Sequence, residues 1–231
     1  MRIVLLHSPL VGPTTWSAVA SQLRRAGEHV VVPDLRSAVT GDPPYLRAVG
    51  RVVASAVDRA PDDGPLLLVG HSGAGPLMPG VADECPAVVD ALVYVDAGLP
   101  RPGTTWFERA PEDLADRVRH LQKDGRLPPW DDWFEPGAVA ALVPDSTVLA
   151  RFRHELPRLP MAVLAEPTPP VAWTGPSGYV LLSEGYRDDA DAARDNGWPV
   201  FEYPSHHLAM LTEPGQITHA LVRLCRLLVT G

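Results

Sequence analysis

The sequence is poor in cysteine, the residue that builds redox centres and many metal sites. Its 231 residues contain only Cys85 and Cys225, and their wide separation matches no metal or redox spacing. We therefore expect both thiols to be reduced and mostly buried in a cytoplasmic protein. The apolar run at residues 1–6 is too short for a signal peptide. No stretch of about 18 apolar residues occurs, so we expect no membrane span.

Positive charge is also scarce. Lys123 is the only lysine among 20 basic residues, which face 28 acidic residues and leave a net charge of −8. This balance argues against nucleic acid or an anionic membrane as a partner. The sequence also lacks the Gly-x-Gly-x-x-Gly and Gly-Lys-Ser/Thr patterns that bind nucleotides. We predict neither a cofactor nor a metal site.

Short apolar runs alternate with helical patterns over most of the chain. Helical spacing extends over residues 45–60, and the last helix carries Ile217, Leu221 and Leu228 on one face. This alternation predicts an α/β fold, with a mostly parallel sheet of about six strands and helices on both faces. The predicted strands cover residues 3–6, 30–32, 66–69, 91–96, 178–183 and 199–203.

Residues 66–75 read Leu-Leu-Leu-Val-Gly-His-Ser-Gly-Ala-Gly. A buried strand, a turn of small residues and a helix start follow one another, as a nucleophile elbow with Ser72 at its apex requires. Small residues at Gly70 and Ala74 suit the tight turn, although the usual pattern ends in Gly rather than Ala. The Gly73 N–H would then be placed to stabilise an oxyanion. The competing interpretation is a plain glycine-rich loop.

With this motif, the chain resembles the α/β-hydrolase superfamily over essentially its whole length. It begins at the strand that carries the family's His-Gly loop, so we expect the family's two N-terminal strands to be absent. A nucleophilic serine needs a base at neutral pH. The segment 207–214 resembles the family's His-x-x-Met-Leu-x-x-Pro stretch, and this register implies His207 as the base. His206 is the alternative.

The base needs a carboxylate that holds its tautomer, and two positions are open. Most of the family carries this acid after the fifth strand here, where Glu184 is the candidate. Asp96 closes the fourth strand instead, which is similar to the haloalkane-dehalogenase branch of the superfamily. An Asp at the end of an apolar strand also needs a reason to be buried. We favour Asp96, because the order Ser72, Asp96, His207 agrees with the order in this fold.

The expected oxyanion hole departs from the family. His7-Ser8-Pro9-Leu10 resembles the His-Gly loop, but Ser8 replaces the Gly. The next residue normally donates its N–H to the oxyanion, and Pro9 has no N–H. Either Leu10 donates instead, or the hole is reduced to Gly73.

The strand pattern stops between residues 99 and 176, where prolines and aromatic residues gather. This stretch is either a helical insertion that only packs on the body or a lid that lines a pocket with apolar rings. We favour the lid, which divides the chain into a core of residues 1–98 and 177–231 and a lid of residues 99–176. The candidate substrate-binding residues are Pro9, Trp106, Trp130, Trp133 and Phe134.

These features predict a serine hydrolase that cleaves a small apolar ester, lactone or thioester through an acyl-enzyme on Ser72. The alternative is a non-hydrolytic enzyme of the same fold, a lyase or cyclase in a biosynthetic pathway, with His207 as acid and base. Pro9 favours this alternative. A ligand-binding protein without turnover is a third possibility, against which the intact Ser/Asp/His set weighs.

Overall fold

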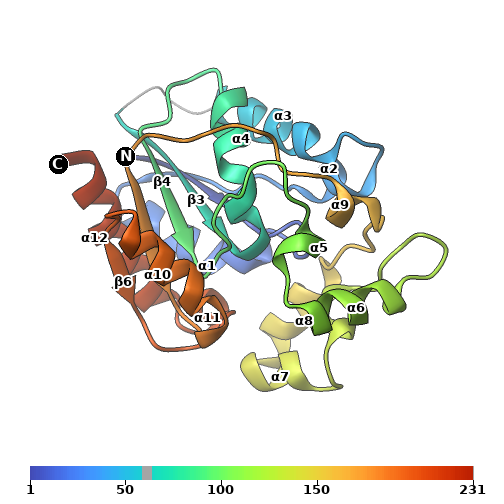
Figure 1. Cartoon of the computed structure of the whole chain (residues 1–231). Coiled ribbons are helices and arrows are strands. Elements are labelled where there is room, and N and C mark those ends of the chain that lie inside the picture. Colours follow the sequence, from blue (N-terminus) through green and yellow to red (C-terminus); the bar gives the residue numbers. More distant parts are fainter. Residues whose placement is uncertain (59–63, 231) are drawn as a thin grey trace.

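A six-stranded parallel sheet forms the centre of the fold in the computed structural model, which describes residues 1–58 and 64–230 (Figure 1). The strand order is β2-β1-β3-β4-β5-β6, and every neighbouring pair is parallel. The prediction of an α/β fold with about six strands is confirmed. The strands are β1 (Arg2–Leu6), β2 (His29–Val31), β3 (Leu66–His71), β4 (Ala91–Val95), β5 (Ser177–Leu181) and β6 (Val200–Glu202).

The central strands are apolar along their whole length because both of their faces are covered. Every residue of β3 and β4 is buried. In their register Val69 is opposite Val93, and His71 is opposite Val95. The two strands therefore end at the same edge of the sheet, and the residues that follow them, Ser72 and Asp96, emerge side by side.

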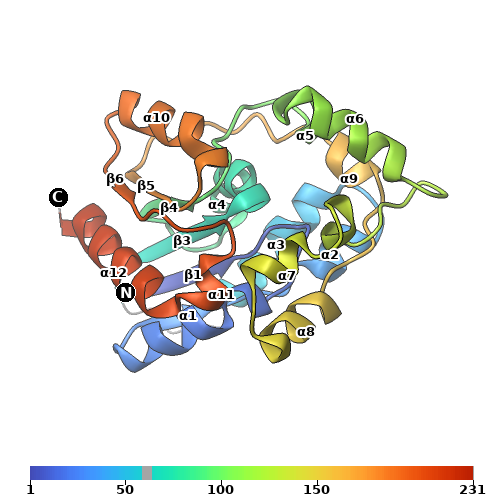
Figure 2. The same ribbon diagram turned by 90° about the horizontal axis from the view of Figure 1, so that it is seen from below.

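Helices cover both faces of the sheet (Figures 1 and 2). Successive side chains of a strand point to opposite faces: Leu67 and Val69 pack in one apolar cluster, and Leu68 packs in the other. The helices on the first side are α1 (Thr14–Arg25), α11 (Ala209–Thr212) and α12 (Pro214–Thr230). Those on the second side are α2 (Arg36–Thr40), α3 (Tyr45–Asp58), α4 (Met78–Glu84) and α10 (Arg187–Asp195).

The predicted and observed helices agree closely in the core. The helix predicted over residues 45–60 is α3, and its last two predicted residues lie outside the described part of the chain. Helix α2 is absent from the prediction because five residues are too few to show helical periodicity. Within residues 1–58 and 64–230, none of the helices has the length and hydrophobicity that a membrane span requires.

Between β4 and β5 the chain forms short helices to one side of the sheet, coloured green to yellow in Figures 1 and 2. Buried Phe152 and Val118 belong to the apolar cluster that continues into the core. The Thr168 N–H donates to the Thr104 carbonyl and the Gly103 N–H donates to the Thr168 carbonyl, each at 3.0 Å, so the two ends of this segment lie together. The helices are α5 (Trp106–Arg109), α6 (Glu112–Leu121), η2 (Trp130–Trp133, a 3₁₀ helix), α7 (Ala138–Leu142), α8 (Ser146–His154) and α9 (Ala162–Ala165).

Two carboxylates of this segment hold it against the core. Glu155 accepts the Thr14 N–H at 2.7 Å, at the first residue of α1. Glu166 accepts the N–H groups of Tyr45 and Leu46 at 2.7 and 3.1 Å, at the start of α3. The first N–H groups of a helix lack partners within the helix and carry partial positive charge. Each carboxylate therefore caps a core helix from a distant part of the sequence.

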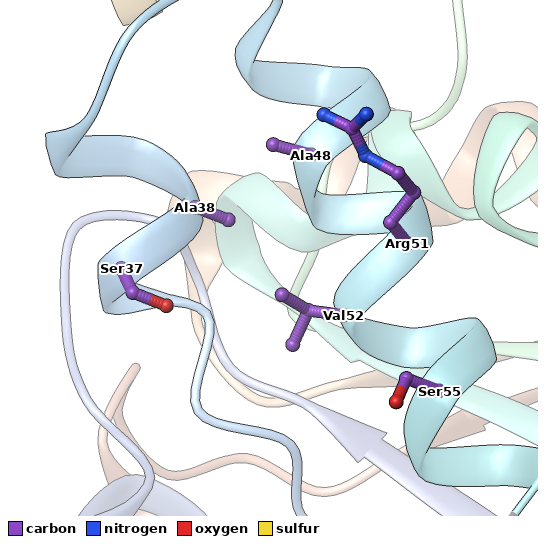
Figure 3. A pocket seen from close by; sticks show the side chains of 6 residues that line it. All are labelled: Ser37, Ala38, Ala48, Arg51, Val52 and Ser55. Atoms are coloured by element: carbon purple, nitrogen blue, oxygen red, sulfur yellow. The ribbon is translucent and has the colours of Figure 1, made fainter.

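A surface pocket of about 370 Å³ lies between α2 and α3 (Figure 3). Ser37 and Ala38 of α2 face it from one side, and Arg51 of α3 stands at its rim. Ala48, Val52 and Ser55 complete the lining. The pocket includes none of the predicted site residues.

The Glu166 cap generates a stability prediction. Glu166→Ala should lower the free energy of unfolding by about 1 kcal/mol, the usual effect of removing a helix cap. Chemical denaturation at neutral pH measures this loss. Glu135→Ala is the matched control, because Glu135 is exposed in the same segment and its side chain has no hydrogen bond or ion pair within the described residues. A loss no larger than that of the control would contradict the capping role.

Candidate active site

Ser72 lies at the sharp turn between β3 and the short 3₁₀ helix η1 (Ser72–Leu77). Its backbone φ is +56°, a left-handed conformation that residues other than glycine rarely adopt. Such strain persists only where the surrounding structure imposes it, and it occurs often at functional sites. The turn thus has the strained backbone that the sequence motif predicts for a nucleophile elbow.

Gly75 allows this turn to approach the end of β4. A Cβ atom at Gly75 would lie only 2.3 Å from the backbone oxygen of Gly98 and 2.9 Å from the Cβ of Ala97. Any side chain here would push the two loops apart. The close approach brings the Ser72 turn against the loop that begins at Asp96.

Ser72, His207 and Asp96 form one continuous hydrogen-bonded line. Ser72 Oγ lies 3.1 Å from His207 Nε2, and His207 Nδ1 lies 2.7 Å from Asp96 Oδ2. His207 is on the loop between β6 and α11. Because a carboxylate only accepts hydrogen bonds, Nδ1 carries the proton toward Asp96 and Nε2 of the neutral ring is left to accept the Ser72 proton.

Asp96 is fully buried, with a left-handed φ of +44°. Its Oδ1 accepts the N–H groups of Leu182 and Ser183, each at 2.9 Å, and its Oδ2 accepts the Ser183 hydroxyl at 2.6 Å. Burial alone would raise the pKa of the Asp96 carboxyl. The hydrogen bond from His207, together with the Ser183 and Leu182 donors, outweighs burial and lowers this pKa. Asp96 therefore stays ionised beside the imidazole.

The alternative acid and base lie in other surroundings. The Glu184 side chain is 82% exposed and pairs with Arg187 at 3.4 Å. His206 Nε2 lies 2.9 Å from Thr212 Oγ1, and His206 Nδ1 accepts the Leu208 N–H at 3.2 Å. Both ring nitrogens of His206 are thus occupied away from Ser72, and the geometry favours Asp96 and His207.

Tyr186 is a site residue that the sequence analysis missed. Its hydroxyl lies 3.2 Å from Ser72 Oγ, and its ring stacks on His207 with 5.0 Å between centroids and 8° between planes. Burial raises the pKa of Tyr186 to about 12, so the hydroxyl keeps its proton at neutral pH. Tyr186 ends the 3₁₀ turn η3 (Glu184–Tyr186). The one sequence feature that could have pointed to Tyr186 is its position in the turn after β5, where most α/β-hydrolases carry the acid of the triad.

His71 supports His207 from the other side. Its Nε2 donates to the backbone carbonyl of His207 at 2.9 Å, and the two ring centroids are 4.5 Å apart. Burial, with the neighbouring His207, lowers the pKa of His71 to about 3. His71 is therefore neutral and holds the His207 loop through this one hydrogen bond.

The oxyanion candidates lie on two neighbouring segments. Gly73 is the second residue of η1, and N–H groups in the first turn of a helix have no partner within it. The Leu10 N–H, expected from the sequence as a possible substitute donor, donates to Ser8 Oγ at 3.3 Å. Pro9 is buried beside Gly73: its Cδ lies 3.6 Å from where a Gly73 Cβ would be.

The predicted aromatic residues separate into two groups. The Trp130 ring lies 6.2 Å from the His207 ring and 5.0 Å from the Phe134 ring. Trp106 contacts Trp133 at 5.9 Å, and Trp133 is buried with its Nε1 donating to a backbone carbonyl. No ring contact joins Trp106 or Trp133 to His207 in the part of the chain that the structure describes. Trp130 thus adjoins the candidate site and has Phe134 packed against it, whereas Trp106 and Trp133 pack within the helical segment.

A hydroxyl, an imidazole and a buried carboxylate in this order are equipped to activate a serine nucleophile. Among residues 1–58 and 64–230, no group of three or more His, Cys, Asp or Glu side chains could hold a metal ion. The side chains that the structure brings together at this site are those of Ser72, His207 and Asp96, with Tyr186 beside them.

Comparisons with known proteins agree with the fold. A carbendazim-hydrolysing esterase from Nocardioides sp. is 31% identical over 122 residues, which are 51% of this chain and 50% of that protein. A pyrethroid hydrolase from Sphingobium wenxiniae is 34% identical over 108 residues, which are 45% of this chain and 38% of that protein. This chain thus aligns with half or less of the length of these relatives.

An extracellular alpha/beta-hydrolase from a Paenibacillus species has a similar structure, with a TM-score of 0.76 and 19% identity. The match covers 97% of this chain and 98% of that one. A sequence model described as "Alpha/beta hydrolase family" matches residues 3–220. Since this match extends over most of the chain, as the resemblance in the sequence predicted, the chain belongs to the alpha/beta hydrolase family.

Proposed function

We propose that this chain is a serine hydrolase that cleaves a small apolar ester, lactone or thioester through an acyl-enzyme on Ser72. The observation that carries the proposal is the line from Ser72 Oγ through His207 to Asp96, with distances of 3.1 and 2.7 Å. The names of the relatives support ester cleavage, since one is an esterase and another a pyrethroid hydrolase.

In the first half of the reaction, Ser72 Oγ attacks the substrate carbonyl carbon and its proton passes to His207 Nε2. Asp96 holds the Nδ1–H and stabilises the imidazolium that forms. The Gly73 N–H donates to the oxyanion of the tetrahedral intermediate. His207 then gives its proton to the leaving oxygen or sulfur, which departs and leaves the acyl group on Ser72.

In the second half, His207 accepts a proton from water, and the resulting hydroxide oxygen attacks the acyl carbon. The Ser72 Oγ–acyl bond breaks, Ser72 regains its proton from His207, and a carboxylic acid is released. Because Ser72 directs its own proton to His207 Nε2, the Tyr186 hydroxyl is left to donate to Ser72 Oγ in the resting site and so restrains that oxygen.

We further propose that residues 99–176 act as a lid and confer a preference for apolar substrates. Trp130 and Phe134 support this role, because the Trp130 ring lies 6.2 Å from the His207 ring and contacts the Phe134 ring. Small-molecule pockets are mostly apolar, with a few polar groups that fix the orientation of the ligand.

The runner-up is a lyase or cyclase in which His207 moves a proton without an acyl-enzyme. One observation favours it: Pro9 has no N–H, and the Leu10 N–H is directed to Ser8. Product analysis separates the two, because only hydrolysis yields one acid and one alcohol or thiol per ester consumed.

The nucleophile is tested by Ser72→Ala. The substrates are p-nitrophenyl esters of increasing acyl length. The kcat of the variant should fall by several powers of ten, up to about 10⁶-fold, because the residues of such a triad act as a unit. Ser17→Ala is the control, because Ser17 is exposed on α1 and bonds only locally to the Pro13 carbonyl. Near-normal turnover by a folded Ser72→Ala protein would refute covalent catalysis by Ser72.

The acid is tested by comparing two substitutions that remove one charge each. Asp96→Asn should lower kcat by about 10⁴, by analogy with the same change in a serine-protease triad. Glu184→Gln should have little effect, because Glu184 is exposed. The kinetics are measured on one short ester, and the reverse ranking would move the acid to the turn after β5.

The role of Tyr186 is tested by a pair of variants. Tyr186→Phe keeps the ring on His207 but removes a hydrogen bond, and should lower kcat/KM about two- to tenfold. Tyr186→Ala should lower it further, because His207 also loses its stacking partner. If both variants keep the native kcat/KM, Tyr186 has no part in the reaction.

A further inference from the structure

The Ser8 hydroxyl has an unused hydrogen-bond donor. Ser8 is only 1% exposed, and its Oγ accepts the Leu10 N–H at 3.3 Å. A hydroxyl has one proton to donate besides its acceptor lone pairs. Within the described residues that proton is donated in no hydrogen bond. Since buried polar groups are usually satisfied, this donor is available to a bound molecule.

The hydroxyl also lies beside the nucleophile turn. A Cβ atom at Gly73 would be only 2.9 Å from Ser8 Oγ, so the oxygen packs directly against this glycine. Gly73 is bonded to Ser72 and supplies the N–H that we propose as one oxyanion donor. The Ser8 hydroxyl therefore stands next to the position where a second donor is needed and where Pro9 offers none.

The surrounding loop holds Ser8 firmly in this place. The Ser8 carbonyl accepts the Val11 N–H at 3.1 Å and lies 2.8 Å from His7 Nδ1. His7 Nε2 accepts the Leu35 N–H at 3.1 Å, which leaves the His7 proton on Nδ1, directed at the Ser8 carbonyl. Burial lowers the pKa of His7, so the ring is neutral and keeps this tautomer. Oxyanion donors act through such preorganisation.

We propose that the Ser8 hydroxyl is the second oxyanion donor of this site, with the Leu10 N–H bonded behind it; the inference rests on the proposed hydrolase function. The Ser8 proton stays on Oγ and is donated to the oxyanion as a hydrogen bond. The Leu10 N–H polarises the hydroxyl, because hydrogen bonds in a chain strengthen one another. The chain departs from the family's His-Gly loop at two positions, with Ser8 in place of Gly and Pro9 in place of a residue with an N–H. In this arrangement the Ser8 hydroxyl replaces the donor that Pro9 lacks.

The first test is the Ser8→Ala variant on p-nitrophenyl acetate. Its kcat should fall by about 10²- to 10³-fold, the usual effect of removing one oxyanion donor. Its KM should change little, because the oxyanion forms only after substrate has bound. Ser8→Thr keeps a hydroxyl and should retain most of the native kcat. Ser17→Ala, on exposed Ser17, should match the native protein.

The second test is rescue by a restored N–H. Adding Pro9→Ala to Ser8→Ala returns an N–H to the position that the family uses, and kcat should rise relative to Ser8→Ala alone. The factor gained should exceed the factor that Pro9→Ala gives in the native background, since neighbouring groups in one network act non-additively. A purely structural role for Ser8 would give no such rescue.

A cooperative unfolding transition first establishes that each variant is folded. The kinetic results then test the role of Ser8 separately from the proposed hydrolase function. A native kcat in Ser8→Ala, with Ser72-dependent hydrolysis intact, overturns the role of Ser8 and leaves the proposed function standing. Absence of Ser72-dependent hydrolysis in the native protein overturns the proposed function and this inference with it. If Ser8→Ala does not fold, Ser8→Cys carries the same expectation, because a thiol is a weak donor.

Discussion

The buried carboxylate of Asp96 is the constraint around which the candidate site is arranged. An ionised carboxylate that is taken out of water destabilises a fold by several kcal/mol unless hydrogen bonds and opposite charge compensate it. The Leu182 and Ser183 donors bind it from the end of β5, and His207 binds it from the loop after β6. One charge at the end of β4 thus fixes two further strand ends and orients the imidazole toward Ser72.

Backbone strain and long-range caps complete this arrangement. Ser72 and Asp96 both have left-handed φ values, +56° and +44°, and such conformations are held only by a well-packed surrounding. Helices α1 and α3 of the core are in turn capped by carboxylates from the segment between β4 and β5. Glu155 caps α1, which follows the Ser8 loop, so the geometry of the proposed oxyanion hole and the placement of the helical segment are physically linked.

Much of this was predictable from the sequence, because it depends on patterns read locally. Apolar runs predicted the parallel strands, and Ser72, Asp96 and His207 come together because each follows the end of a strand. Tyr186 lies 114 residues from Ser72, and Glu155 lies 141 residues from Thr14; no local pattern encodes such pairs. Likewise, a count of tryptophans could not separate Trp130, beside His207, from Trp133, which is buried within the helical segment.

Covalent capture of Ser72 tests the central claim most directly. The native protein is treated with a fluorophosphonate, and the adduct is located by intact mass and by peptide mapping. We predict a single phosphonyl group on Ser72, formed with loss of fluoride, and much slower labelling of His207→Ala, because the serine then lacks its base. No adduct on a folded native protein, or an adduct at another residue while Ser72 stays unmodified, would contradict the account.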